Sequence, residues 1–180
     1  MKKVILAELK ELALAAKSNL WKNAKALDRD VKLYLHWSAG HYNQFWDDYH
    51  INIDSDGSVY VSTTDLAELK AHTWHRNSGA IGIALLCCAG ANTNDLGKES
   101  PTGLQIEAMA QVIAVLCKAL DLIIDSEWVM THAEAADQDD YGPKTTCERW
   151  DLWFLKTGDK PGTGGNILRG KANFYSERLP

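Results

Sequence analysis

Six histidines are the side chains of this sequence with the widest chemical use, because an imidazole binds metals and exchanges protons near neutral pH. They are His36, His41, His50, His72, His75 and His132. A single histidine is more often a hydrogen-bonded structural residue than a metal ligand. The sequence contains neither an HExxH motif nor a CxxC pair, so two common zinc signatures are excluded. A chemical site must therefore combine residues that lie far apart in the sequence.

Two of these histidines are predicted to lie at the ends of β-strands. Residues 31–37, VKLYLHW, alternate in polarity and are rich in strand-forming residues, which predicts a strand that ends at His36. Small residues follow it, as expected of a loop. Residues 128–131 predict a second, short strand that delivers His132. The sequence therefore places one imidazole at the end of each of two strands.

The remaining pattern predicts a fold in which helices and strands mix. The predicted elements are an amphipathic helix over residues 1–27, a hairpin from Tyr49 to Ser62 turning at Asp56-Gly57, a buried strand over residues 81–88, and a helix from the Thr102–Gln105 capping box to Ile124. An irregular acidic loop follows over residues 135–147, and then a short aromatic helix that ends near Gly158. Hairpin and crossover connections together predict an α/β fold with a single mixed central sheet flanked by helices.

Length and composition limit the class of protein. The 180 residues fit one domain, which we divide into an N-terminal helix (1–30), a core (31–157) and a C-terminal extension (158–180). The formal net charge of -5 argues against a nucleic-acid partner, which requires a basic surface. Charged residues interrupt the first apolar segment, so no secretion signal is expected, and no apolar run approaches the ~20 residues that span a membrane. We expect a soluble monomer, made in the cytoplasm and not inserted in a membrane.

Four segments, in this order, resemble the N-acetylmuramoyl-L-alanine amidases, the family of phage endolysins, bacterial recycling amidases and peptidoglycan recognition proteins. They are LHWSAG, with the strand-end histidine; YHINIDSDGSVY, similar to the Tyr-His strand and Asp-Gly turn of the family; HTWHRNSGAIGIAL, similar to its Asn-x-x-Ser-Ile-Gly-Ile strand; and THAE, similar to its second ligand strand. The resemblance covers residues 31–157. It implies an amidase/PGRP-like fold and a peptidoglycan substrate.

The resemblance also implies a zinc site. It makes His36 and His132 two ligands of a Zn²⁺ ion, which needs one further protein ligand and an open position for catalysis. The family places an Asp or Cys in a Lys-x-Asp/Cys-Pro-Gly segment, but here the loop is longer and no Pro-Gly follows. Asp151, ahead of the predicted aromatic helix, is the preferred third ligand. Cys147, which lies close behind Lys144, is the alternative.

The catalytic residues implied by the resemblance are less regular. Many relatives carry a Glu in the IGI strand where this chain has Ala84. We therefore predict that Glu134 is the proton shuttle, because two residues after His132 it would lie on the same face of a strand. Tyr49 matches a tyrosine of the family that can hydrogen-bond the zinc-bound water or the oxyanion. Lys144 occupies a place similar to its oxyanion-stabilising lysine.

The function expected from these residues is zinc-dependent hydrolysis of the amide between N-acetylmuramic acid and L-alanine, which degrades the bacterial cell wall. One alternative is a recognition module of the same fold that binds peptidoglycan without cutting it. Another is a hydrolase that uses Cys147 as nucleophile and His132 as base. Without a secretion signal, an enzyme of this kind would act on the wall after release at lysis or delivery by another machine, as an endolysin does, or would recycle wall fragments in the cytoplasm.

Overall fold

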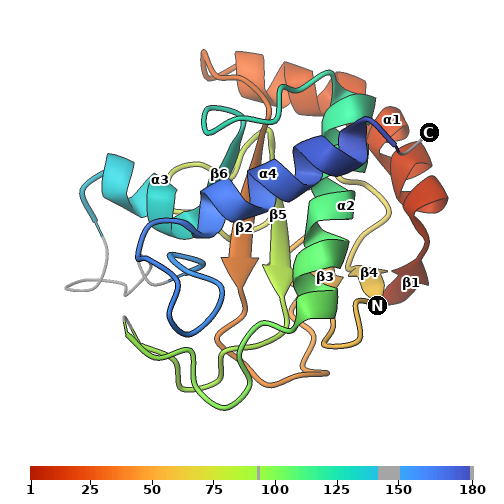
Figure 1. The fold of residues 1–180 in the computed structure, drawn as a ribbon. Helices are drawn as coiled ribbons and strands as arrows, with labels where there is room; N and C mark the ends of the chain where they lie inside the picture. Colours follow the sequence, from red (N-terminus) through yellow and green to blue (C-terminus); the bar gives the residue numbers. More distant parts are fainter. Residues whose placement is uncertain (93, 142–150, 179–180) are drawn as a thin grey trace.

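The computed structural model describes residues 1–92, 94–141 and 151–178. Its elements, in chain order, are β1 (Lys2–Val4), α1 (Leu6–Lys25), β2 (Lys32–Trp37), β3 (Ile51–Ile53), β4 (Val59–Val61), β5 (Ala80–Leu85), α2 (Gly103–Leu120), β6 (Val129–Thr131), α3 (His132–Gln138) and α4 (Gly164–Ser176). Figure 1 shows α2 and α4 in front of the strands and α3 at one side of the sheet.

The strands form one mixed sheet in the order β1-β4-β3-β5-β2-β6. The neighbours β3, β5, β2 and β6 run parallel, whereas β4 pairs antiparallel with both β3 and β1. The β3–β4 hairpin is the one predicted from the sequence, with Gly57 at a φ of 81° in its turn. The predicted α/β class with a single mixed central sheet is therefore confirmed.

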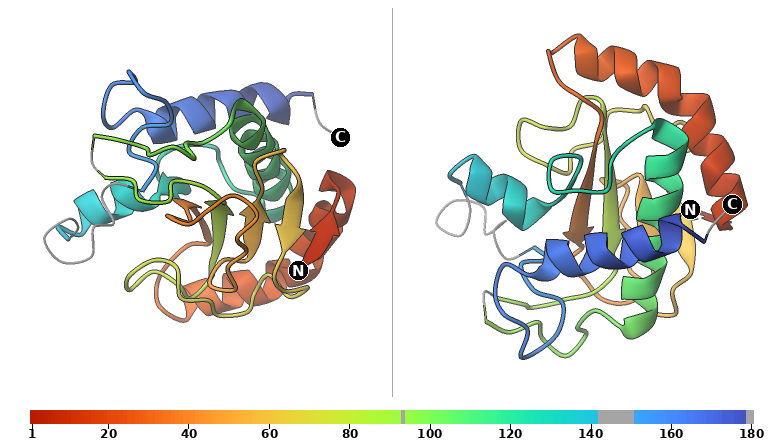
Figure 2. Two further views of the ribbon diagram at one scale, coloured as in Figure 1. Left: turned by 90° about the horizontal axis from the view of Figure 1, so that it is seen from below. Right: turned by 45° about the horizontal axis from the view of Figure 1, so that its top comes forward.

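Helix α2 is the central core helix. It begins at the predicted capping box, where the Thr102 hydroxyl accepts from the Gln105 N–H, and ends where Asp121 turns into the left-handed conformation with a φ of 58°. By length and composition α2 could cross a membrane, but 67% of that stretch is buried inside the protein. It packs against the sheet and against both α1 and α4 (Figure 2). A core position explains its apolar composition.

Three predicted segments differ from the structure in the kind of element that they form. The first residues form strand β1 before α1 begins at Leu6, and residues 151–158 form turns and bends instead of an aromatic helix. The chain after Thr131 does not continue as a strand, because His132 is the first residue of α3. Thr131 and Glu134 form a capping box, with the Thr131 hydroxyl accepting from the Glu134 N–H at 3.1 Å.

The C-terminal extension contains helix α4, which the sequence did not predict because the helix begins with two glycines. Gly164 and Gly165 are the first residues of α4, and both are buried. A Cβ on Gly164 would lie 2.0 Å from the Leu152 carbonyl oxygen, and one on Gly165 would lie 2.3 Å from a Glu134 carboxylate oxygen. Only glycine permits this close approach, which brings the start of α4 against α3 and the Asp151 segment.

Candidate metal centre

The sheet brings His36 and His132 together although 96 residues separate them. Strands β2 and β6 are parallel neighbours, and Leu35 is in register with Thr131. The residue after each of these two is a histidine, so both imidazoles lie at the edge of the sheet where the parallel strands have their carboxyl ends. His36 follows Tyr34 on one face of β2, opposite to Leu33 and Leu35, which belong to the main core. The predicted strand ends therefore converge on one place.

A carboxylate completes this group. His36 Nδ1 lies 3.1 Å from His132 Nδ1, and Asp151 Oδ2 lies 3.1 Å from His36 Nδ1 and 3.0 Å from His132 Nδ1. The three residues are 0%, 5% and 5% exposed in chain order. Within the residues that the structure describes, these three form a group that could hold a metal ion, called the metal group below. Asp151 is the preferred third residue of the sequence analysis, whereas Cys147 lies outside the described residues.

The donor atoms of this group fit a zinc ion. Two imidazole nitrogens and one carboxylate oxygen are a typical donor set for catalytic zinc, which leaves a fourth position open. Ligand atoms at bonds of 2.0–2.1 Å around a tetrahedral ion lie about 3.3 Å from one another. The observed separations of 3.0–3.1 Å are close to this value.

The backbone of β2 and the two imidazoles orient the third residue. The Trp37 N–H donates a short hydrogen bond to Asp151 Oδ1, which leaves Oδ2 facing His36 and His132. Burial opposes ionisation of Asp151, but hydrogen bonds from the two imidazoles outweigh it and lower the pKa of the carboxyl. Asp151 is therefore present as the carboxylate, the form that binds a metal.

Two more histidines pack behind His36. The ring of His72 lies 5.4 Å from that of His36, and the ring of His50 lies 5.6 Å from that of His72. Burial lowers the pKa of His50 to about 4, and burial together with the neighbouring imidazoles lowers that of His72 well below its ordinary value. Both rings are therefore neutral at pH 7, and neither belongs to the group of His36, His132 and Asp151.

The neutral state of His50 predicts acid sensitivity of the metal-free protein. Between pH 6.5 and its folded pKa of about 4, the unfolded chain binds a proton that the folded protein does not, so stability falls as the pH falls. The expected loss from this residue is about 3 kcal/mol between pH 7 and pH 4. Urea unfolding of the chelated protein at both pH values measures it. In His50→Gln the loss of stability between pH 7 and pH 4 should be smaller by that amount. A loss as large as in the wild type would contradict the neutral state of His50.

Glu134 does not take the position predicted for it. Because it lies in α3 and not in a strand, a residue two positions after His132 points to a different side of the element. Its carboxylate accepts from both Arg169 Nη atoms at 2.8 Å each, and from the Thr131 N–H at 2.8 Å. Arg169 also donates to the Val129 carbonyl at 2.9 Å. Glu134 therefore joins α3, β6 and α4, and the predicted strand placement, from which its role as proton shuttle was inferred, was wrong.

This placement predicts that Glu134→Gln damages stability more than chemistry. The amide keeps the shape but removes the charge opposite Arg169, which is 6% exposed, so the free energy of unfolding should fall by about 1–3 kcal/mol. Urea unfolding measures the loss, and zinc affinity should stay at the wild-type value. A variant of unchanged stability whose turnover falls by about 100-fold would instead restore Glu134 as the proton shuttle.

Two other predicted catalytic residues have different outcomes. The Tyr49 ring lies 5.0 Å from the His36 ring, so the phenol stands beside the metal group. Lys144 lies outside the described residues. Ala84 of β5 is in register with His36 and is fully buried, so a methyl group occupies the place beside His36 where many relatives carry a carboxylate.

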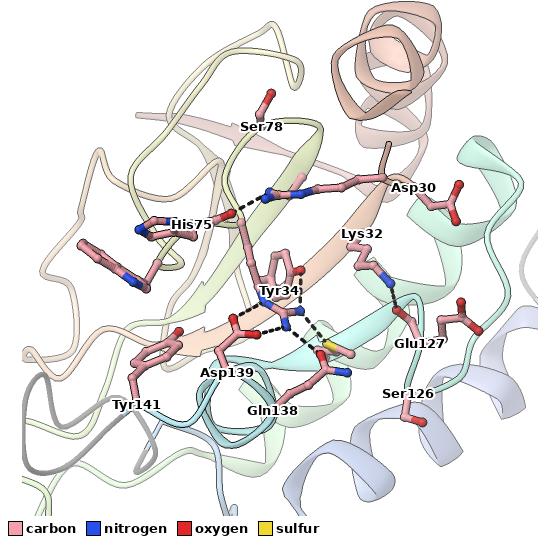
Figure 3. Close-up of a pocket in the computed structure, with 15 residues that line it drawn as sticks. Asp30, Lys32, Tyr34, His75, Ser78, Ser126, Glu127, Gln138, Asp139 and Tyr141 are labelled. Atoms are coloured by element: carbon pink, nitrogen blue, oxygen red, sulfur yellow. Dashed lines mark hydrogen bonds and ion pairs between the residues drawn. The ribbon is translucent and has the colours of Figure 1, made fainter. Parts of the chain in front are cut away.

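An open cavity of about 800 Å³ lies on the same face of β2 as His36, around Tyr34 and Met130 (Figure 3). Arg76 lines this cavity, and its guanidinium donates to the Asp139 carboxylate at 2.6 and 2.7 Å. Hydrogen bonds that Arg76 donates to Asp139 and Tyr34 raise the pKa of its guanidinium, so its charge is permanent. Tyr141 lines the cavity, and its ring lies 6.3 Å from that of His132. The cavity therefore extends towards the metal group.

Comparisons with known proteins place these features in a family. Residues 16–150 match the family model described as N-acetylmuramoyl-L-alanine amidase. A search of curated proteins gave no significant match. Among solved structures, the endolysin amidase LysCS from Clostridium intestinale URNW is 19% identical with a TM-score of 0.43, and the match covers 59% of this chain and 70% of that one. PGRP-SA of Apis mellifera is 16% identical with a TM-score of 0.41, covering 56% and 69% of the two chains.

The family match covers most of the chain, including His36 and His132, and stops one residue before Asp151. Asp151 therefore lies outside the match, and the structure alone brings it to the two histidines. With a match over more than half of its length, the chain belongs to the N-acetylmuramoyl-L-alanine amidase family.

Proposed function

We propose that this protein is a zinc-dependent amidase that hydrolyses the amide between N-acetylmuramic acid and L-alanine in bacterial peptidoglycan. The observation that carries the proposal is the buried group of His36, His132 and Asp151, whose ligand atoms all lie within 4.8 Å of one another. Family membership supplies the substrate class. The donor set supplies the metal, because imidazole and carboxylate ligands with one open position are typical of hydrolytic zinc.

Zinc bound at this group would lower the pKa of a water molecule towards ~7 and polarise the scissile carbonyl. The side chains of the protein do the remaining work. His36 and His132 present their Nδ1 atoms, and the Trp37 N–H fixes Asp151 so that Oδ2 faces both. We propose that Tyr49, whose ring lies 5.0 Å from that of His36, donates a hydrogen bond to the oxygen that becomes negative during hydrolysis.

The cavity beside the metal group is the proposed location for part of the substrate. Trp74 lines this cavity and is 60% exposed, and Tyr141 also lines it, with its ring 6.3 Å from that of His132. Flat aromatic faces of this kind pack against sugar rings and peptide side chains. The Arg76–Asp139 pair offers a fixed polar group for orientation.

Digestion of purified sacculi tests the proposed activity. We expect new N-terminal L-alanine and no new reducing sugar ends, because an amidase cuts the peptide from the glycan and leaves the glycan chain intact. A chelator should abolish the release and zinc should restore it. Release that persists in chelator would favour the Cys147–His132 hydrolase instead, and reducing ends would contradict the proposed bond.

A peptidoglycan-binding module without catalysis is the second candidate. The observation that favours it is Ala84, which leaves the side of His36 without the carboxylate found in many relatives, while Arg169 holds Glu134. Such a module would sediment with purified sacculi and release nothing from them in the presence of zinc. Retention of both histidines with an acidic third residue leads us to favour the enzyme.

We further propose that the protein is a monomer that acts on the cell wall after release or delivery. Expression inside a bacterium should then leave the cells intact until their membrane is permeabilised, after which turbidity should fall. Lysis that begins without permeabilisation would contradict delivery as the controlling step.

A further inference from the structure

A threonine hydroxyl lies on the side of His36 that faces away from the metal group. Thr73 is 2% exposed, and its Oγ1 lies 3.4 Å from His36 Nε2 and 2.9 Å from His72 Nδ1. Both neighbours are ring nitrogens, so the hydroxyl connects the two imidazoles. The sequence analysis assigned no role to Thr73.

The threonine is held in place by its neighbours in the chain. Asn77 Oδ1 accepts from the Thr73 N–H at 2.7 Å and from the His72 N–H at 3.1 Å, which fixes the two-residue segment. The His72 ring lies against Gly82 of β5, where a Cβ would come within 2.6 Å of His72 Cγ. Gly82 therefore leaves the space that the ring fills.

The direction of these hydrogen bonds follows from the metal site. If Nδ1 of His36 binds the ion, its Nε2 must carry the proton and needs an acceptor. Thr73 Oγ1 accepts the hydrogen bond from this N–H at 3.4 Å, and its hydroxyl proton then points to the nearer ring nitrogen, His72 Nδ1, at 2.9 Å. If His72 instead carried its proton at Nδ1, the N–H groups of both His36 and His72 would point at Thr73 Oγ1. The hydroxyl proton of Thr73 would then have no ring nitrogen to accept it.

We propose that Thr73 is a positioning residue for the metal centre: its hydroxyl accepts from His36 Nε2, donates to His72 Nδ1, and thereby fixes the ring orientation and tautomer in which His36 Nδ1 faces the ion. The inference rests on the zinc site proposed above. Ligand histidines gain metal affinity from such partners, which are usually carboxylates or carbonyls, and loss of the partner typically weakens binding by about 10–100-fold.

Zinc affinity of two variants tests this role. Thr73→Val keeps the shape and removes the hydroxyl, so competition with a chromophoric chelator should show zinc binding weakened by about 10–100-fold. Thr73→Ser keeps the hydroxyl and should bind zinc like the wild type. Thermal unfolding of the chelated proteins identifies any general loss of stability.

Histidine-ring ¹H–¹⁵N spectra of the zinc-loaded wild type give an independent readout. We expect His36 and His72 both to be protonated at Nε2 and not at Nδ1. Equal zinc affinity in Thr73→Val and wild type, equal weakening in both variants, or a His72 protonated at Nδ1 would overturn the inference while leaving the zinc site intact. A wild type that binds no zinc would overturn both.

Discussion

Replacing His36 with glutamine should lower the rate of peptidoglycan hydrolysis by at least about 10³-fold, a barrier increase of about 4 kcal/mol. His36 is fully buried at the end of β2 and offers Nδ1 to the shared group. Glutamine fills much of the same space but is a poor zinc ligand, so the zinc content should fall with the rate. Release of L-alanine termini from sacculi and metal analysis of the purified variant measure the two effects.

The same substitution at His132 serves as the matched comparison. Both imidazoles contribute one ligand atom to the group, so both variants should lose zinc and activity together. Unfolding in chelator separates loss of the metal from loss of the fold. A His36→Gln protein that retains zinc and hydrolyses sacculi at the wild-type rate would remove His36 from the site.

Two substitutions of Asp151 should differ in their effect on zinc affinity and activity, because the new side chains differ as zinc ligands. Asp151→Asn replaces a carboxylate with a neutral amide, and we expect activity and zinc affinity each to fall by about 100-fold or more. Asp151→Cys supplies a thiolate, which is itself a good zinc ligand with a bond of about 2.3 Å, and should recover most of the affinity. Zinc titration and sacculus digestion of the two proteins test this order.

The contrast between Asn and Cys separates a metal ligand from a structural carboxylate. The Asp151 carboxylate also accepts from the Trp37 N–H, a role that an asparagine side-chain oxygen can retain and a cysteine cannot. If holding β2 in place were its main task, Asn would therefore behave like the wild type and Cys would fail. That order of the two variants would contradict the ligand assignment.

The positions of His36 and His132 could be predicted because they follow from strand patterns, whereas their role as ligands was implied by the resemblance to the amidase family. Residues 31–37 alternate clearly, and parallel neighbours in a sheet end at the same edge, so a histidine after each strand is brought to one place. The third ligand could not be derived in this way. The sequence before Asp151 shows no clear periodicity, and the segment that contains Asp151 packs closely at Leu152 against Gly164, a contact that no local periodicity encodes.

The sequence contains a signal that would have placed Glu134 correctly in a helix. Thr131 followed by Glu134 is a capping box, which predicts the first turn of a helix and not a continuing strand. The resemblance to a ligand strand outweighed this local signal. Thr73 carried no signal of its own, because its role arises from the packing of the 72–73 segment under His36, and only the three-dimensional arrangement shows it.

We propose that His36, His132 and Asp151 bind one zinc ion. Crystallography with anomalous diffraction across the zinc absorption edge tests it most directly, on protein that is active in sacculus digestion. We predict a single anomalous peak about 2.0–2.2 Å from His36 Nδ1, His132 Nδ1 and Asp151 Oδ2. An active protein whose zinc peak lies away from these three atoms, or which shows no peak, would contradict it.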